Sequence, residues 1–202
     1  MSAAPHMPSP TNSQRQGIIE LICGCMFSGK TTAVLKELEK EPAQNILVLK
    51  HNKDDRYSRA RIMTHDGEGL DALSVTCSKE IVERVSNETE VVVIDEGHFY
   101  DDGLPSVCKQ LAEQGKRVII AALDLDMWGL QFDVIEQIRE SAGVVRVQQS
   151  ICAACGKPAT HTHRKTPIVG AHIVGGAEDF EPRCKACWSP PREAHIDSSE
   201  MA

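Results

Sequence analysis

An eight-residue motif near the N-terminus limits the possible folds of this chain more than any other part of the sequence. Residues 24–31 read GCMFSGKT and fit the pattern G-x-x-x-x-G-K-[ST]. An apolar run at 18–23 precedes the motif and a helix-forming stretch at 31–40 follows it. Because this strand–loop–helix context is the one the motif needs, we predict a phosphate-binding loop rather than a chance match in an ordinary turn.

The chemistry of such a loop follows from its backbone. The loop and the start of the next helix point N–H groups at one place, so they bind phosphate oxygens. Lys30 would place a cation beside the β- and γ-phosphates, and Thr31 would offer a hydroxyl to Mg²⁺. The residues expected to bind the nucleotide here are Gly24, Cys25, Met26, Phe27, Ser28, Gly29, Lys30 and Thr31.

The rest of the first 150 residues alternates between apolar runs and helical patterns. The expected strands are 18–23, 46–50, 91–94, 117–122 and 144–147, and the expected helices are 31–40, 81–85, 104–114 and 131–140. Continuous β-branched runs between helices indicate a parallel sheet covered on both faces. We therefore predict an α/β P-loop domain over 17–150, with Pro- and Ser-containing disordered tails at 1–16 and 189–202.

Two acidic residues follow the apolar run at 91–94. Parallel strands end at the same edge of a sheet, so Asp95 should lie near the phosphate loop and belong to the Mg²⁺ shell. Glu96 is a candidate general base that accepts the proton of a hydroxyl as it is phosphorylated. Hydrolytic ATPases also carry a glutamate here, so the pair predicts phosphoryl transfer and leaves the acceptor open.

The C-terminal part carries two C-x-x-C units on either side of residues 156–183. Their cysteines are Cys152, Cys155, Cys184 and Cys187. This spacing predicts a structural tetrahedral Zn²⁺ site over 151–188, and four thiolates would leave no open position for metal catalysis. Two redox pairs or idle thiols remain the alternative. His161 and His163 are expected to be loop residues rather than ligands.

Composition narrows the class of protein. The net charge of −7 argues against non-specific nucleic-acid binding, which needs a basic face. No apolar stretch approaches the ~20 residues of a membrane span, and the first residues lack a signal-peptide pattern. We expect a reducing, cytoplasmic setting. Glu37 is expected on a solvated helix face.

Together these motifs resemble the thymidine kinase family of animals, many bacteria and poxviruses, over residues 18–188. Further matching segments are KDDRY at 53–57, THD at 64–66, DEGHF at 95–99, ALD at 122–124 and VGGAEDF at 174–180. The resemblance implies a RecA-like domain and a zinc domain whose long lasso loop closes over the nucleoside. It also implies transfer of the γ-phosphoryl group of ATP to the 5′-hydroxyl of thymidine, a homotetramer, and inhibition by the triphosphate end product.

The resemblance assigns roles to individual residues. It makes Glu96 the proton acceptor, Asp95 the magnesium-shell acid and Arg56 a phosphate-side arginine, and it places Asp54, Gly97 and His98 on the nucleotide side. The implied substrate residues are Met26, Phe99, Met127, Thr162, Ala171, Ile173, Val174, Gly175 and Phe180.

Several positions depart from the family pattern, and three of them belong to the expected site. Cys25 replaces a frequent proline, and its side chain is expected to point away from the phosphates. Met127 replaces an aromatic residue, which removes stacking on the base, and Phe180 replaces a tyrosine, which removes a hydroxyl.

Two other functions remain open at this stage. One is a kinase for another deoxynucleoside, and the other is a P-loop ATPase or switch module whose zinc ribbon docks a macromolecule. The glycine-rich, apolar segment between the cysteine pairs favours a lid over a small molecule.

Overall fold

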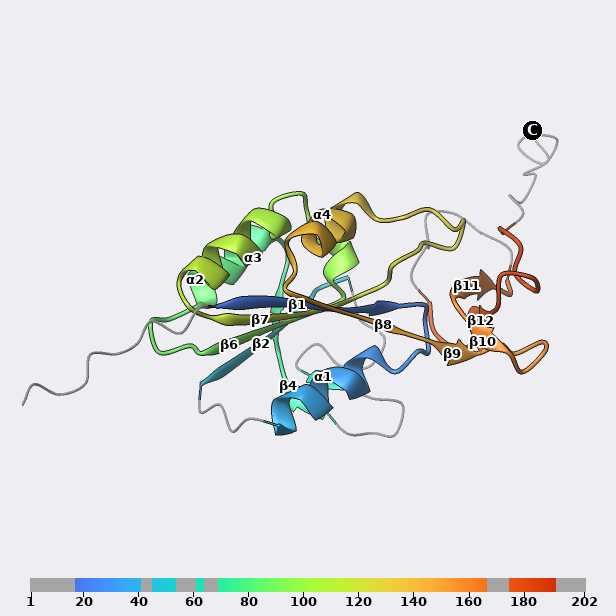
Figure 1. The fold of residues 1–202 in the computed structure, drawn as a ribbon, viewed down its shortest axis with the longest axis horizontal. Helices are drawn as coiled ribbons and strands as arrows, with labels where there is room; N and C mark the ends of the chain where they lie inside the picture. The colour runs from blue at the N-terminus through green and yellow to red at the C-terminus, as the bar shows by residue number, and fades with distance from the viewer. Residues whose placement is uncertain (1–16, 41–44, 54–60, 64–68, 167–174, 192–202) are drawn as a thin grey trace, which may run out of the picture.

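A six-stranded parallel sheet forms the centre of the computed structural model, which describes residues 17–40, 45–53, 61–63, 69–166 and 175–191 (Figure 1). The strand order is β5-β2-β6-β7-β1-β8. In that order the strands are Leu73–Val75, Ile46–His51, Val91–Asp95, Arg117–Ala122, Ile18–Gly24 and Val144–Gln148. All neighbouring pairs are parallel, as the alternating pattern predicted.

Helices cover both faces of this sheet. Figure 1 shows α1 (Lys30–Glu39) on one face and α2 (Ser78–Arg84), α3 (Leu104–Glu113) and α4 (Asp133–Ser141) on the other. Because side chains alternate along a strand, β6 feeds both cores: one core contains Val92 and the other contains Val93. The four expected helices and five expected strands are therefore confirmed within a few residues.

Elements too short to show a period were missed. They are β5, the 3₁₀ turn η1 (Gly97–Phe99), and the antiparallel pair β3 (Arg61–Met63) and β4 (Gly69–Asp71), and each has three residues. Pattern recognition needs longer runs than these. In the part of the chain that the structure describes, no helix is long and apolar enough to cross a membrane.

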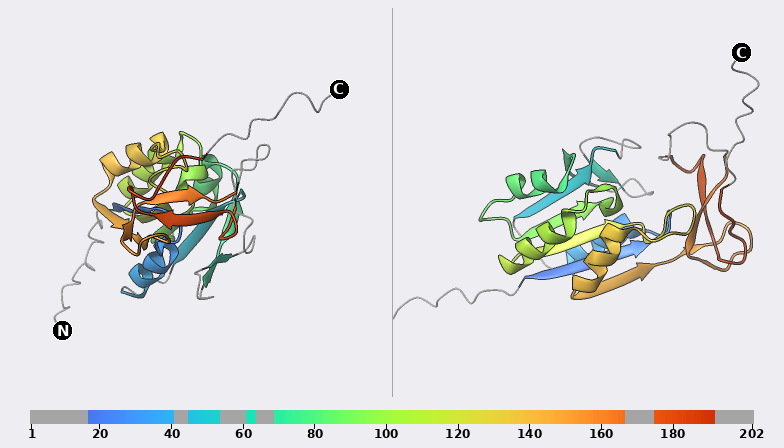
Figure 2. Two further views of the ribbon diagram at one scale, coloured as in Figure 1. Left: turned by 90° about the vertical axis from the view of Figure 1, so that its right-hand side faces the viewer. Right: turned by 90° about the horizontal axis from the view of Figure 1, so that it is seen from above.

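The cysteine-bearing segment folds at one end of the main sheet (Figure 2). There β9 (Ser150–Ile151) pairs with β10 (Pro158–Ala159), and β11 (His161–Arg164) pairs with β12 (Phe180–Arg183). We call β11 and β12 the β11–β12 ribbon. The prediction of a loop over 156–183 is thus wrong at both ends, since polar residues such as His161 and His163 occupy a strand of the ribbon.

Glu37 is also not where the sequence suggested. It is 7% exposed and lies between arginines brought in from β7 and β8. Arg117 contacts Glu20 at 2.6 Å and Glu37 at 3.3 Å, while Arg146 contacts the same carboxylates at 2.7 and 3.4 Å. Helix periodicity cannot reveal a cluster of charges whose members lie this far apart in sequence.

Candidate functional site

The phosphate loop joins β1 to α1 through unusual backbone angles. Gly24 has φ 145°, and a Cβ there would lie 2.2 Å from the carbonyl oxygen of Gln148, so only glycine fits. Phe27 has φ 61°, a conformation that is strained for a side-chain-bearing residue and typical of functional loops. Gly29 (φ 77°) begins α1 without a side-chain cap, so the first N–H groups of the helix remain available to an anion.

Two polar side chains complete this cradle. Lys30 Nζ donates to the carbonyl oxygens of Gly24 (3.2 Å) and Cys25 (2.8 Å). Burial lowers the pKa of Lys30, while the negative charge of Glu96 opposes this shift. Ser28 Oγ is buried and has no hydrogen-bond partner in the described part of the chain. A half-buried cation and an unsatisfied hydroxyl in one loop fit the phosphate groups of a nucleotide.

Carboxylates gather at the same edge of the sheet. Asp95 ends β6, is 7% exposed, and accepts the backbone N–H of Glu96 at 3.0 Å. Glu96 adopts a left-handed backbone (φ 52°), and its side chain is 15% exposed. Strand β7 lies between β6 and β1 and leads to Asp124. The negative charge of Asp124, like that of Glu96, partly opposes the lowering of the Lys30 pKa by burial.

Asp124 had no role in the sequence analysis, although it belongs to the ALD segment. The sequence could have indicated Asp124, because it comes shortly after the buried apolar strand β7, much as Asp95 ends the apolar strand β6. What the sequence did not reveal is that β7 would separate the phosphate-loop strand from β6, which places Asp124 between them.

His98 lies beneath this acidic edge. Its side chain is 3% exposed, and Nδ1 lies 3.5 Å from Glu96 Oε2. The same Nδ1 accepts the backbone N–H of Leu123 at 3.2 Å. A nitrogen that accepts a hydrogen bond carries no proton, so the imidazole is the neutral Nε2–H form and makes no ion pair with Glu96 through Nδ1.

An apolar cluster adjoins the phosphate loop. Met26, Met127 and Phe180 form one buried cluster, drawn from the loop, the segment after β7 and strand β12. The backbone N–H of Met26 donates to Thr162 Oγ1 on β11 at 3.0 Å. The structure thus brings together four of the residues expected to contact a nucleoside, including both methionines.

The other expected residues stand differently. Phe99 is half-buried between the rings of His98 (4.2 Å between centroids) and His51 (6.0 Å). Gly97 and Gly175 are described: Gly97 is buried at the start of η1, and Gly175 lies close to Asp179. Asp54, Arg56, Ala171, Ile173 and Val174 lie outside the described residues.

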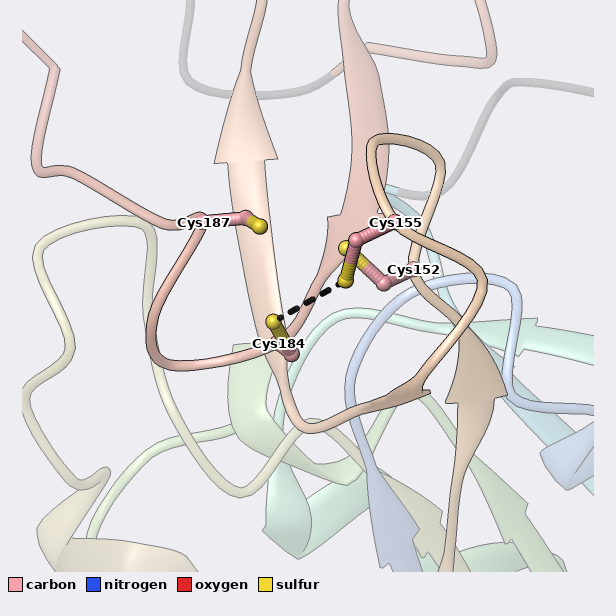
Figure 3. A group of neighbouring side chains, drawn as sticks. All are labelled: Cys152, Cys155, Cys184 and Cys187. Atoms are coloured by element: carbon pink, nitrogen blue, oxygen red, sulfur yellow. Dashed lines mark hydrogen bonds between the residues drawn. The ribbon is translucent and has the colours of Figure 1, made fainter.

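The four predicted cysteines converge (Figure 3). Cys152, Cys155, Cys184 and Cys187 place their sulfurs within 4.8 Å of one another, with 3.6 Å between those of Cys155 and Cys184. Zn–S bonds of about 2.3 Å in a tetrahedron require sulfurs about 3.8 Å apart, so the group fits Zn²⁺.

The thiols also show the electrostatics of a metal site. Burial opposes ionisation of Cys152, but backbone N–H groups, first that of Cys184, outweigh it and lower its pKa to about 6. The neighbouring sulfurs of Cys155 and Cys184 raise the pKa of Cys187 to about 12. The sulfurs cannot all ionise next to one another without a cation, which is what a bound dication supplies.

Cys25 connects the two halves of the site. Its Sγ lies 3.6 Å from the carbonyl oxygen of Ala159, and it is buried in one cluster with Cys152 and Cys184. The side chain therefore points to the four-cysteine cluster and away from the phosphate cradle, as predicted.

Comparisons with known proteins agree with this geometry. The family model described as thymidine kinase matches residues 17–188. A thymidine kinase from Rhodothermus sp. (strain ITI 518) is 39% identical over 184 residues, which cover 90% of this chain and 86% of that protein. Among solved structures, the Legionella pneumophila ATPase DotB matches with a TM-score of 0.41 and 14% identity, over 72% of this chain and 44% of that one, a likeness too weak to carry an argument. On its sequence and its site, this chain belongs to the thymidine kinase family.

Proposed function

We propose that this chain transfers the γ-phosphoryl group of ATP to the 5′-hydroxyl of thymidine. One observation carries the proposal most strongly: Met26 belongs to both the phosphate loop and the buried apolar cluster with Met127 and Phe180. A donor nucleotide bound in the loop and an acceptor nucleoside bound at this cluster would therefore meet beside Met26. Membership of the thymidine kinase family supports thymidine as that acceptor.

The phosphate loop has the parts for binding and orienting the donor. In the free protein Lys30 is hydrogen-bonded to its own loop carbonyls, and phosphate oxygens would replace those carbonyls as acceptors. Thr31 and Asp95 would hold Mg²⁺, which neutralises charge on the phosphates when it is bound. From the resemblance, we add Arg56 and Asp54 to the phosphate side.

Glu96 would act on the acceptor. It would take the proton of the 5′-hydroxyl as the new O–P bond forms and the bond to the departing ADP breaks. Its left-handed backbone turns the chain sharply after β6, and maintaining such a conformation without glycine is typical of functional positions.

Met26, Met127 and Phe180 would surround the base, with Thr162 and Phe99 beside them. Methionine fills space adaptably, which suits a pocket that lacks the usual stacking aromatic. From the resemblance, the backbone of Ala171, Ile173, Val174 and Gly175 would contact the base edge. Zn²⁺ would hold the ribbon that carries Thr162 and Phe180.

The family resemblance also supports a cytoplasmic homotetramer that is inhibited by the triphosphate end product. These parts of the proposal concern the assembly and its regulation, and the test of activity does not depend on them.

A substrate panel tests the activity. ADP release from ATP is measured with purified protein and thymidine, deoxyuridine, deoxycytidine or deoxyguanosine. We expect the highest kcat/KM for thymidine. A preference for a purine nucleoside would refute thymidine as the substrate, and ATP turnover that ignores nucleosides but responds to a macromolecule would refute the kinase.

A further inference from the structure

Trp188 directly follows Cys187 and contacts both strand β11 and the segment after β7. Its backbone N–H donates to the carbonyl oxygen of Cys184 at 2.9 Å, which makes it part of the second cysteine turn. Its indole N–H donates to the carbonyl oxygen of Thr162 at 3.0 Å. The indole also packs on His161, with 4.8 Å between ring centroids. These contacts therefore hold Trp188 to both the second C-x-x-C unit and β11.

The other side of the indole lies against the backbone of a tight turn. Gly129 has φ +82°, and a Cβ on it would lie 2.9 Å from Cη2 of Trp188. Glycine is needed here both for the left-handed backbone and for this close approach. A displacement of the indole would therefore also displace this turn.

This turn, residues 126–130, is internally rigid and carries Met127. Asp126 N–H donates to the carbonyl oxygen of Leu130 at 2.8 Å, and Gly129 N–H donates to that of Asp126 at 3.1 Å. Asp126 Oδ1 accepts the N–H groups of Trp128 and Leu130, each at 2.8 Å. A turn closed this way moves as a unit, so what fixes Gly129 also fixes Met127.

We propose that Trp188 is a positioning residue for the nucleoside pocket, because it locks the Met127 turn to the β11–β12 ribbon. Thr162 and Met127 stand on the two sides of this lock, and Thr162 is joined in turn to the phosphate loop through Met26. Through this lock, the positions of Thr162 and Met127 depend on the second C-x-x-C unit, which begins at Cys184. The effect on the nucleoside rests on the proposed function, whereas the effect on the turn does not.

Kinetics of two variants test the lock. Trp188→Phe keeps most of the packing but removes the indole N–H, and Trp188→Ala removes both. Loss of a neutral hydrogen bond changes an equilibrium constant about fivefold. We expect the KM for thymidine to rise about fivefold in the Phe variant and at least tenfold in the Ala variant. The KM for ATP and kcat should stay within about twofold, because the phosphate edge is untouched.

A matched control lies in the same turn. The side chain of Leu130 is 65% exposed, so Leu130→Ala truncates the turn without touching the lock. It should leave the KM for thymidine within about twofold. Zinc per chain is measured in every variant. If Trp188→Ala loses zinc, the Phe variant alone decides.

A double-mutant cycle isolates the contact itself. Gly129→Ala introduces both backbone strain and a clash with the indole, but only the clash depends on Trp188. Gly129→Ala should therefore raise the KM for thymidine more in the wild type than in the Trp188→Ala background. Equal effects in both backgrounds would overturn the lock.

Hydrogen exchange gives a readout that needs no substrate. Amides of 124–132 should exchange faster in the zinc-loaded Trp188 variants than in the wild type or Leu130→Ala. If the wild type phosphorylated no nucleoside, the proposed function would fail while this measurement still tested the lock. Unchanged exchange, or an unchanged KM for thymidine in a zinc-loaded variant of an active enzyme, would overturn the proposal.

Discussion

Glu96 and His98 lie 3.5 Å apart, from Oε2 to Nδ1, but Nδ1 is already the acceptor for the backbone N–H of Leu123. The distance alone would suit an ion pair with a protonated imidazole. The Leu123 hydrogen bond decides against it, because one nitrogen cannot both carry a proton and accept one. His98 thus connects the turn after β6 to the segment after β7 without neutralising Glu96 through Nδ1.

Variants of His98 test this connection. His98→Asn can retain an acceptor near Nδ1, whereas His98→Ala leaves the Leu123 N–H without this partner, a change worth about 1–3 kcal/mol when the group is buried. We expect kcat to fall about tenfold in the Ala variant and distinctly less in the Asn variant, with the KM for ATP unchanged in both. A large rise in the KM for ATP would instead indicate that His98 contacts the nucleotide.

Glu96→Gln should remove the proton acceptor while preserving size. General-base catalysis contributes roughly 10²–10⁴-fold, so kcat should fall by that factor while the Kd for ATP is retained. Single-turnover kinetics and equilibrium nucleotide binding measure the two effects. Glu140→Gln, on the exposed side of α4, serves as the control. Wild-type kcat in Glu96→Gln would exclude Glu96 as the base.

Asp124→Asn should change the pH dependence. Burial lowers the pKa of Lys30, and the charge of Asp124 is among those that raise it. Removing that charge lowers the pKa of Lys30 further, so the ammonium is lost at lower pH. The alkaline limb of kcat/KM for ATP should therefore move to lower pH. Asp102→Asn, at an exposed position, should not move this limb. An unmoved limb in Asp124→Asn would show that the charge of Asp124 does not affect the ionisation of Lys30.

Cys184→Ser should release zinc and loosen the pocket. Four sulfurs within 4.8 Å of one another hold the metal only as a complete set. We expect loss of bound zinc, a raised KM for thymidine, and a Tm lowered by about 5 °C or more, since metal binding contributes to folding. Cys77→Ser is the control because Cys77 lies outside this cluster. Full zinc content in Cys184→Ser would contradict the assignment.

The cluster of Glu20, Glu37, Arg117 and Arg146 should stabilise the fold in a pH-dependent way. Burial opposes ionisation of Glu20, but hydrogen bonds from Arg117 and Arg146 hold its pKa below 4.5. The contribution is therefore complete above pH 4.5 and is lost as the pH falls through the lowered value.

Glu20→Gln tests this dependence. The free energy of unfolding at pH 7 should fall by about 2 kcal/mol, because two arginines each lose one of their two carboxylate partners. The variant should also lose less stability than the wild type between pH 5 and pH 3. Denaturant titrations at several pH values measure both effects. An equal loss of unfolding free energy between pH 5 and pH 3 in the variant and the wild type would show that Glu20 makes no pH-dependent contribution.

Much of the site could be read from the sequence because it is local in the chain. The phosphate loop, the pair Asp95 and Glu96, and each C-x-x-C unit are short segments whose residues act together wherever the segment lies. Strands β6 and β7 are mostly apolar, which is why their burial and parallel pairing were also predictable. The convergence of the four cysteines was foreseen for the same reason, since the spacing of the two C-x-x-C units is a property of the chain.

What remained hidden depends on contacts between distant segments. Helix α1 looked solvated at Glu37 because two of the residues that bury it come from β7 and β8. The segment at 156–183 looked like a loop because β11 and β12 are mostly polar and pair only with each other. His98 accepts the backbone N–H of Leu123, which lies 25 positions away in the chain, and no local pattern reports such a contact.

Short stretches of the sequence are enough to identify the chemical groups of this protein: an anion-binding loop, a carboxylate pair and a set of thiols. How these groups meet depends on the tertiary structure. The order of strands sets Asp124 between the loop and the acidic pair, and the bond from Met26 to Thr162 spans 136 positions of the chain. Local patterns report the periodicity of single elements, whereas such contacts arise only when elements far apart in sequence bury their surfaces against each other.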